Sequence, residues 1–144
     1  MAKAENFDLK DFMPYLLNQA ADTTSRGFEG AYRTKYGMLR TEWRVLFHLG
    51  RYGKLTAKEI CERAQIHKTK VSRAVRALEE KRFLTRKEVP DDRRHEMLAL
   101  TKSGQRVFQE LIQEAQKFDA ALLKDFSAQE TALMRTLLTR LADL

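Results

Sequence analysis

Apolar residues recur at intervals of three and four along most of this chain, which is the spacing of one face of an α-helix. One apolar stripe covers Leu9–Ala20, and a second, Phe28–Tyr36, continues the same predicted helix past a polar patch. The next helix is expected to begin with Thr41 as its N-cap and to stop near Gly50 and Gly53. The N-terminal part of the chain is therefore predicted to be helical.

The middle of the chain has the pattern of a short helix, a tight turn and a second helix. Thr56 and Glu59 form a capping box, in which the Thr hydroxyl accepts from the third helical amide and the Glu side chain reaches back to the cap. A turn at residues 65–67 precedes the second predicted helix, at about Lys68–Lys81. The apolar residues of this second helix share one face: Val71, Ala74, Val75 and Leu78.

Two strand-like segments follow, Phe83–Val89 and Met97–Leu100, and the polar segment Pro90–Arg94 between them has the composition of a hairpin tip. Thr101 then caps a long predicted helix, and a second capping box at Ser127 opens the last one. The pattern predicts a mainly α fold with a small β-hairpin, in the order of four helices, two strands and two helices.

Both ends of the chain carry more apolar surface than one small domain covers by itself. The N-terminal stripe includes Phe12, Leu16 and Leu17. The last helix is rich in leucine, with Leu133, Leu137, Leu138, Leu141 and Leu144 on one side. A second copy of the chain would cover both stripes, so we expect a dimer formed by the N- and C-terminal helices.

Composition limits the class of protein further. The chain has 144 residues, of which 43% are hydrophobic, enough for one packed domain or two lobes that share a core. No apolar run approaches the roughly 20 residues that span a bilayer, and Met1–Lys10 lacks the apolar stretch of a secretory signal. The single Cys61 excludes an intrachain disulfide and fits a small core residue in a reducing compartment. We expect a cytoplasmic protein without membrane contact.

The positive charge is concentrated in one block. Between Lys54 and Arg106 there are 15 Lys and Arg residues against 8 Asp and Glu residues, whereas the rest of the chain has 12 of each. No acidic residue lies between His67 and Ala77. This segment carries the polar side chains that we expect to contact DNA: Lys68, Thr69, Lys70, Ser72, Arg73 and Arg76. Two further arginines, Arg93 and Arg94, lie in the predicted hairpin tip.

A basic helix followed by a basic hairpin is typical of a protein that contacts double-stranded DNA at two points. An α-helix fits the major groove, where its polar residues meet base edges, and a guanidinium at a hairpin tip suits the narrow minor groove. The alternative is a merely solvated basic face. It is less favoured because the segment lacks compensating acids and contains Thr and Ser.

This region also resembles the winged helix-turn-helix of MarR-type regulators, from about Leu39 to Gly104. The resemblance is carried by Leu39-Arg40-Thr41-Glu42-Trp43-Arg44-Val45-Leu46, Ile66-His67-Lys68-Thr69-Lys70-Val71-Ser72-Arg73 and Leu78-Glu79-Glu80-Lys81-Arg82-Phe83-Leu84. Asp92-Arg93-Arg94, followed six residues on from its last arginine by Leu100-Thr101, is similar to that family's wing signature. The resemblance implies a homodimer that binds a pseudo-palindromic operator, usually as a repressor, and that is often released by a small aromatic or anionic ligand.

The resemblance also implies a division of the chain and roles for its residues. Residues 1–38 would be an N-terminal dimerisation region, 39–104 the winged helix-turn-helix lobe and 105–144 the C-terminal dimerisation helices. Arg94 matches the wing-tip arginine, and Asp92 matches the acid that orients it through a charge-assisted hydrogen bond. Two positions depart from the family pattern: His67 stands where Ser is frequent, and Arg82 where Gly is common.

A candidate ligand site lies at the junction between the dimer helices and the DNA-binding lobe, where the family places its pocket. Its residues are Arg40, Trp43, Arg44 and His48. Aromatic rings beside a guanidinium suit an aromatic carboxylate or an acyl-CoA thioester. The alternative is that Trp43 belongs to the core and that the arginines form surface ion pairs. The three histidines lack the spacing of metal ligands, so neither a metal nor a cofactor is expected.

These observations favour a sequence-specific, ligand-responsive transcriptional regulator. A repressor released by a small aromatic carboxylate or an acyl-CoA-type ligand is the expected form, and a non-specific architectural DNA-binding protein is the alternative. An enzyme is not expected, because the chain has no G-x-S-x-G, P-loop, dinucleotide fingerprint or H-E-x-x-H motif.

Overall fold

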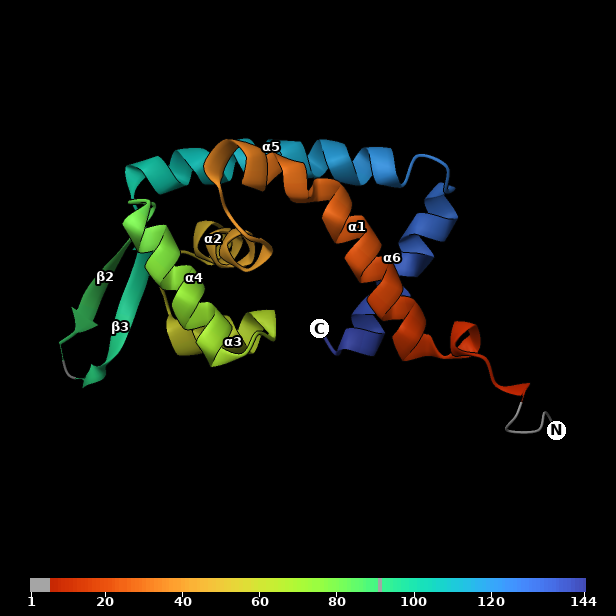
Figure 1. Ribbon diagram of the computed structural model, residues 1–144, viewed down its shortest axis with the longest axis horizontal. Helices are drawn as coiled ribbons and strands as arrows, with labels where there is room; N and C mark the ends of the chain where they lie inside the picture. Colours follow the sequence, from red (N-terminus) through yellow and green to blue (C-terminus); the bar gives the residue numbers. More distant parts are fainter. Residues whose placement is uncertain (1–5, 91) are drawn as a thin grey trace.

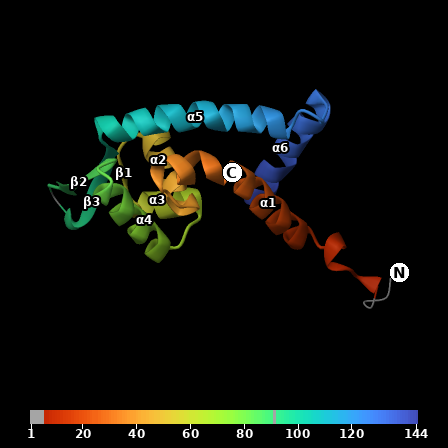
Figure 2. The same ribbon diagram turned by 45° about the horizontal axis from the view of Figure 1, so that its top comes forward.

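The computed structural model describes residues 6–90 and 92–144, with the backbone only at residues 92–95. A long helix, α5, runs along one side of the molecule and joins two parts (Figure 1). A winged lobe, built from α2, α3, α4 and the strands, lies at one end of α5. At the other end α1 and α6 extend away from that lobe, and Figure 2 shows the same arrangement with its top turned forward.

The helices and strands follow the predicted order, with one added strand and one added helical turn. Their bounds are η2 Leu9–Asp11, α1 Met13–Tyr36, α2 Arg40–Tyr52, β1 Leu55–Thr56, α3 Ala57–Ala64, α4 Lys68–Glu80, β2 Leu84–Val89, β3 Asp92–Leu100, α5 Lys102–Leu122 and α6 Ala128–Ala142. The mainly α fold with a small β-hairpin is thereby confirmed.

Three predicted helix caps are confirmed. The hydroxyls of Thr56, Thr101 and Ser127 each accept a hydrogen bond from the backbone amide three residues on, at 3.0–3.1 Å. These bonds satisfy amides that have no partner inside the helix, and therefore fix where α3, α5 and α6 begin.

The predicted start of α2 needs correction, whereas its predicted end is confirmed at the second of the two glycines. Leu39, not Thr41, is the N-cap; its side chain makes no cap hydrogen bond, and its own amide donates to the Glu42 carboxylate at 3.2 Å. The helix continues through Gly50 and ends at Tyr52, with Gly53 as its C-cap at a left-handed φ of 80°. Gly50 serves packing instead: a Cβ there would lie 2.4 Å from the Phe108 ring of α5.

The first predicted helix is interrupted near its start. Leu9–Asp11 forms a separate 3₁₀ turn, and α1 begins at Met13. Pro14 in the first turn of α1 explains the break, since proline has no amide hydrogen with which to continue a helix from the preceding turn. The predicted continuation from the first stripe through Phe28–Tyr36 is confirmed.

The sheet has three antiparallel strands in the order β1-β3-β2. β1 was not predicted, because it contributes only Leu55 and Thr56, paired with Leu98 and Met97 of β3. β3 begins at Asp92 instead of Met97, so Asp92, Arg93 and Arg94 belong to the strand beside the tip and not to the turn itself. Five polar residues in succession gave no strand signal. They belong to the strand because Glu96 pairs with Glu88 and Asp92 with Val89 of β2, with a register shift between these two pairs.

The buried core lies in the winged lobe and beneath α5. Val71, Ala74, Val75 and Leu78 of α4 are buried, as predicted. They belong to one cluster with Val45, Leu46 and Leu49 of α2 and Val107, Phe108 and Leu111 of α5. Gly104 permits the close packing of α5 on the wing base, because a Cβ there would lie 2.0 Å from the Phe83 carbonyl oxygen. The core thus fixes α4 with its polar face outward.

The apolar ends of the chain lie on the surface. On α6, Leu133 is 58% exposed and Leu141 60% exposed, and on α1, Leu16 is 41% exposed. Within the described part of the chain, no helix has the length and apolar character needed to cross a membrane.

Candidate nucleic-acid interface and the adjoining cavity

The exposed face of α4 carries every polar residue that the sequence singled out on this helix. Lys68, Thr69, Lys70, Ser72, Arg73 and Arg76 are all exposed, as are Glu79 and Glu80 in the last turn. Arg76 lies 3.4 Å from Glu80, which partly neutralises it. No ion pair among the described side chains involves Lys68, Lys70 or Arg73. The N-terminal half of α4 therefore presents cations without protein counterions.

His67 caps this helix in place of the more usual serine. Its Nδ1 accepts from the Thr69 amide at 3.2 Å, which requires the neutral imidazole with an unprotonated Nδ1. The cap fixes the turn from which α4 leaves α3.

The wing is the β2–β3 hairpin, which projects from the lobe beside α4 (Figure 1). Asp92, Arg93 and Arg94 lie on β3 next to the tip, and their side chains lie outside the described residues, as does Asp91 altogether. An unpredicted ion-pair network joins the wing to α4: Arg86 of β2 lies 3.2 Å from Glu79 of α4 and 3.7 Å from Glu96 of β3.

The base of the wing adopts the conformation that the family pattern suggests. Arg82 has a φ of 64°, the left-handed region that favours glycine, and its carbonyl accepts from the Thr101 hydroxyl at 2.7 Å. Tyr36 of α1 packs on the neighbouring Phe83 with ring centroids 6.1 Å apart. Tyr36 and Lys35 also donate to Glu110 of α5. The hydrogen bond from Lys35, and then that from Tyr36, lower the pKa of the Glu110 carboxyl.

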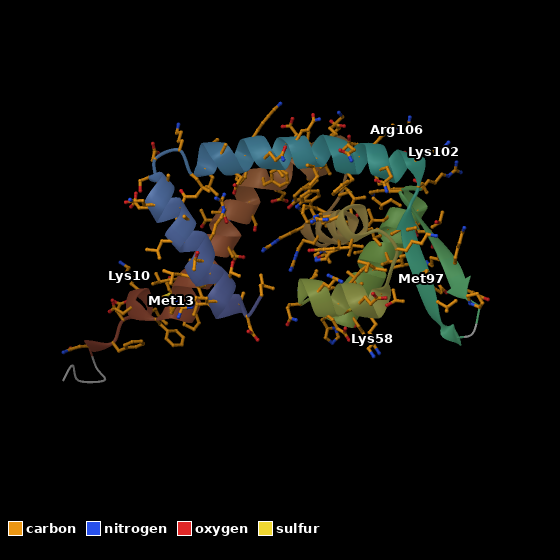
Figure 3. The ribbon with its side chains drawn as sticks, turned by 180° about the vertical axis from the view of Figure 1, so that it is seen from behind. Lys10, Met13, Lys58, Met97, Lys102 and Arg106 are labelled. Carbon is orange, nitrogen blue, oxygen red and sulfur yellow. The ribbon has the colours of Figure 1, made fainter. Side chains whose placement is uncertain are left out.

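The basic block of the sequence does not lie on one face. Lys58, on the first turn of α3, points to the side of the lobe away from α5, whereas Lys102 and Arg106 lie on α5 itself (Figure 3). The net positive charge is thus divided between the α3–α4 side and the outer side of α5.

A cavity of about 810 Å³ lies between α1, α2 and α5. Its lining residues are Thr24, Ser25, Phe28, Tyr32, Arg40, Trp43, Arg44, Phe47, Arg51, Ile112, Ala115, Gln116, Phe118, Asp119 and Leu122. Three of the four predicted ligand residues, Arg40, Trp43 and Arg44, are among them. His48 is not: its Nδ1 lies 2.7 Å from the Arg44 carbonyl oxygen, and its ring lies beside Tyr52.

Aromatic rings form one wall of the cavity. The centroid of Phe28 lies 5.5 Å from that of Trp43 and 5.4 Å from that of Phe118, and Trp43 lies 5.5 Å from Phe47. Trp43 is half-buried against the core as well, so it serves both as a core residue and as cavity lining.

Arg44 is a partly buried cation in the lining of the cavity. It is half-buried, and its Nη2 donates to the Ala64 carbonyl at 2.6 Å, at the end of α3. Burial, and then the neighbouring Arg40, lower the pKa of the Arg44 guanidinium. None of the ion pairs found among the described side chains neutralises it. A partly desolvated cation of this kind is suited to an anionic ligand.

Comparison with known sequences places these features in context. A sequence model of the MarR family matches residues 36–95. A relative from Bacillus subtilis, the uncharacterized HTH-type transcriptional regulator YwoH, is 30% identical over 95 residues, which are 66% of this chain and 69% of the relative.

Solved structures share the whole fold. A MarR/EmrR family transcriptional regulator from Acinetobacter sp. ADP1 is 26% identical, with a TM-score of 0.85 over 95% of this chain and 96% of that chain. The PcaV transcriptional regulator from Streptomyces coelicolor, in complex with its natural ligand, is 23% identical, with a TM-score of 0.80 over 99% and 98%. A mutant MarR from E. coli, complexed with operator DNA, is 20% identical, with a TM-score of 0.80 over 90% and 92%. The last two show likeness of fold alone.

Proposed function

The chain belongs to the MarR family of transcriptional regulators, and from this premise we propose that it represses transcription as a homodimer bound to a pseudo-palindromic operator. We further propose that an aromatic carboxylate or an acyl-CoA-type ligand, bound in the cavity between α1, α2 and α5, releases it from DNA. The observation that carries the proposal is the exposed basic face of α4 opposite a buried apolar face, where Lys68, Lys70 and Arg73 have no ion-pair partner among the described side chains.

The proposed DNA contacts divide between the helix and the wing. On α4, Thr69, Lys70, Ser72 and Arg73 would meet base edges in the major groove, with Lys68 and Arg76 on phosphates. Arg93 and Arg94 would enter the adjoining minor groove, and Asp92 would orient Arg94. The MarR structure complexed with operator DNA, which has the same fold, supports DNA binding by this fold.

The proposed dimer rests on the apolar surfaces of α1 and α6. A row of leucines on α6 and the exposed Phe12 and Leu16 near the start of the chain would be covered by a second copy. We accordingly assign residues 1–38 and 105–144 to dimerisation and 39–104 to DNA binding. Two-fold symmetry then predicts two half-sites in the operator.

Arg44 suggests how a ligand would act on DNA binding. The same guanidinium lines the cavity and holds the Ala64 carbonyl at the end of α3, immediately before the turn that leads into α4. An anion that draws Arg44 toward the cavity would compete with this hydrogen bond. The PcaV complex with its natural ligand supports small-molecule binding in this fold.

Selection of bound duplexes from a random pool tests the proposal against the architectural alternative. A regulator enriches a pseudo-palindromic sequence, and the enriched duplex binds at least roughly a thousandfold more tightly than a scrambled one at fixed salt concentration. Absence of any enriched sequence would favour non-specific binding. Addition of candidate ligands to the preformed complex then tests release.

A further inference from the structure

Two long helices, α1 and α5, connect the winged lobe to the part of the molecule that we propose to form the dimer. The last turns of α1 reach the lobe, and α5 leaves the lobe from its first turn, so the two helices run in opposite directions (Figure 1). With 24 and 21 residues, they are about 36 and 32 Å long. Their mutual position therefore determines how the lobe is held relative to the dimer helices.

An aromatic contact and a polar contact join α1 to α5. Towards the outer end, the ring centroids of Phe28 and Phe118 lie 5.4 Å apart. At the lobe end, Lys35 Nζ donates to Oε1 of Glu110, and the Tyr36 hydroxyl donates to Oε2. On each helix eight residues, or about 12 Å of helix length, separate the two contacts. The contacts therefore match in register.

The polar contact is the directional one of the two. Hydrophobic contact is non-directional and tolerates rotation of one helix over the other, whereas a hydrogen bond weakens steeply when its angle changes. Among the described side chains, no hydrogen bond or ion pair other than those of Glu110 joins α1 to α5. Glu110 thus fixes how the end of α1 lies on α5.

The same end of α1 contacts the base of the wing and leads directly into α2. The ring centroid of Tyr36 lies 6.1 Å from that of Phe83, which precedes β2. Gly37 ends α1 with a left-handed φ of 63°, and α2 begins at Arg40. A shift of Tyr36 on α5 would therefore move both the base of the wing and the start of α2.

We infer that Glu110 is a positioning residue for operator recognition: its hydrogen bonds fix the angle at which each winged lobe leaves the dimer helices, and hence the spacing between half-sites that the protein accepts. The inference rests on the proposed dimer and its two half-sites. One added base pair moves the half-sites apart by about 3.4 Å and rotates them by about 35° around the duplex axis. A lobe at a fixed angle follows this change less readily than one released from Glu110.

Operators of altered spacing provide the assay. The intact protein is titrated at one salt concentration with the selected operator, with versions that carry one base pair more or fewer between the half-sites, and with a duplex that holds one half-site. The titrations are repeated with Glu110→Ala and with Tyr36→Phe, which removes one donor but keeps the ring on Phe83. Glu114→Ala is the matched control, because Glu114 lies one turn further along α5 and pairs within that helix, with Lys117 at 3.7 Å.

The wild-type protein is expected to prefer the native spacing about tenfold or more. Glu110→Ala should reduce this preference about threefold, the effect of one partly exposed ion pair, and Tyr36→Phe should act in the same direction. The affinity for one half-site should stay unchanged, as should the spacing preference of Glu114→Ala. An unchanged spacing preference in Glu110→Ala, or an equal reduction in Glu114→Ala, would overturn the inference. If Glu110→Ala does not fold, Tyr36→Phe decides in the same way.

The outcomes separate this inference from the proposed function. If selection yields no preferred sequence, the proposed operator binding is wrong, and the inference fails with it. If an operator is selected and Glu110→Ala lowers its affinity equally at every spacing, operator binding stands. Glu110 then only stabilises the fold, and the inference is wrong.

Discussion

Replacement of Arg73 by alanine tests whether α4 reads sequence. The Arg73 side chain is exposed and has no ion-pair partner among the described side chains, so its loss leaves no buried group unsatisfied. Alanine is also the best helix former, so α4 should persist. Arg76→Ala is the matched control, because Arg76 lies one turn further on the same face and is partly neutralised by Glu80 at 3.4 Å.

The expected magnitude follows from the kind of contact. A bidentate arginine–base contact is worth about 1–3 kcal/mol of discrimination, which is roughly 5- to 140-fold in affinity for each half-site. A phosphate contact instead weakens all duplexes alike and changes the salt slope by about 0.9. Arg73→Ala should therefore lower operator affinity more than scrambled-duplex affinity, and the effect should double in free energy across two half-sites.

The measurement is a pair of titrations, with operator and with scrambled duplex, at one salt concentration and then over a salt series. Arg76→Ala should lower both affinities by a similar and smaller factor. If Arg73→Ala weakens operator and scrambled duplex equally, Arg73 contacts only phosphate and the assignment of base readout is wrong.

Three further predictions concern assembly and stability. Truncation after Phe126 removes the exposed leucines of α6 and should give monomers or aggregates in sedimentation; a well-folded dimer would contradict the proposed interface. Arg82→Gly should raise the free energy of unfolding by about 1 kcal/mol, because Arg82 has a left-handed φ of 64° that glycine adopts more easily. Lys81→Gly is the control and should lower the free energy of unfolding, because φ at Lys81 is −76°. If both substitutions stabilise the protein, the backbone at Arg82 is not strained. The hydrogen bonds from Lys35 and Tyr36 lower the pKa of the Glu110 carboxyl, so they stabilise the folded protein above about pH 4 and lose this effect as the carboxyl becomes protonated at lower pH. Tyr36→Phe should therefore lower the melting temperature more at pH 7 than at pH 3. An equal decrease at both pH values would contradict this prediction.

The parts of the fold that the sequence predicts correctly are local. The caps at Thr56, Thr101 and Ser127 depend on bonds within three residues, and the buried face of α4 depends on helical spacing alone. The error at Thr41 is local too, because the helix begins at Leu39, whose amide donates to the Glu42 carboxylate three residues on. The role of Gly50 depends on a distant neighbour instead, the Phe108 ring of α5.

The strand errors have the same physical origin. β1 contributes two residues and exists only because β3 pairs with it, and the first residues of β3 are polar throughout. Neither shows the alternation by which a strand is recognised in a sequence. The Arg86 contacts with Glu79 and Glu96 could not be expected either, because they depend on how the hairpin lies against α4.

Helical spacing predicts which side chains of α2 point in the same direction, but the neighbouring helices decide which direction faces the cavity. Measured around the axis of α2 from the direction of Arg40, the side chain of Trp43 points at about −60° and that of Arg44 at about +40°. The middle of the arc that faces the cavity therefore lies near −10°. His48 leaves at about +80°, roughly 90° from that middle, which explains why it lies beside Tyr52 and not in the cavity. Arg51, at about +20°, falls inside the arc. The spacing contained this information, but only the packing of α1 and α5 on α2 shows which arc faces the cavity, and it is this packing that adds Arg51 to the lining.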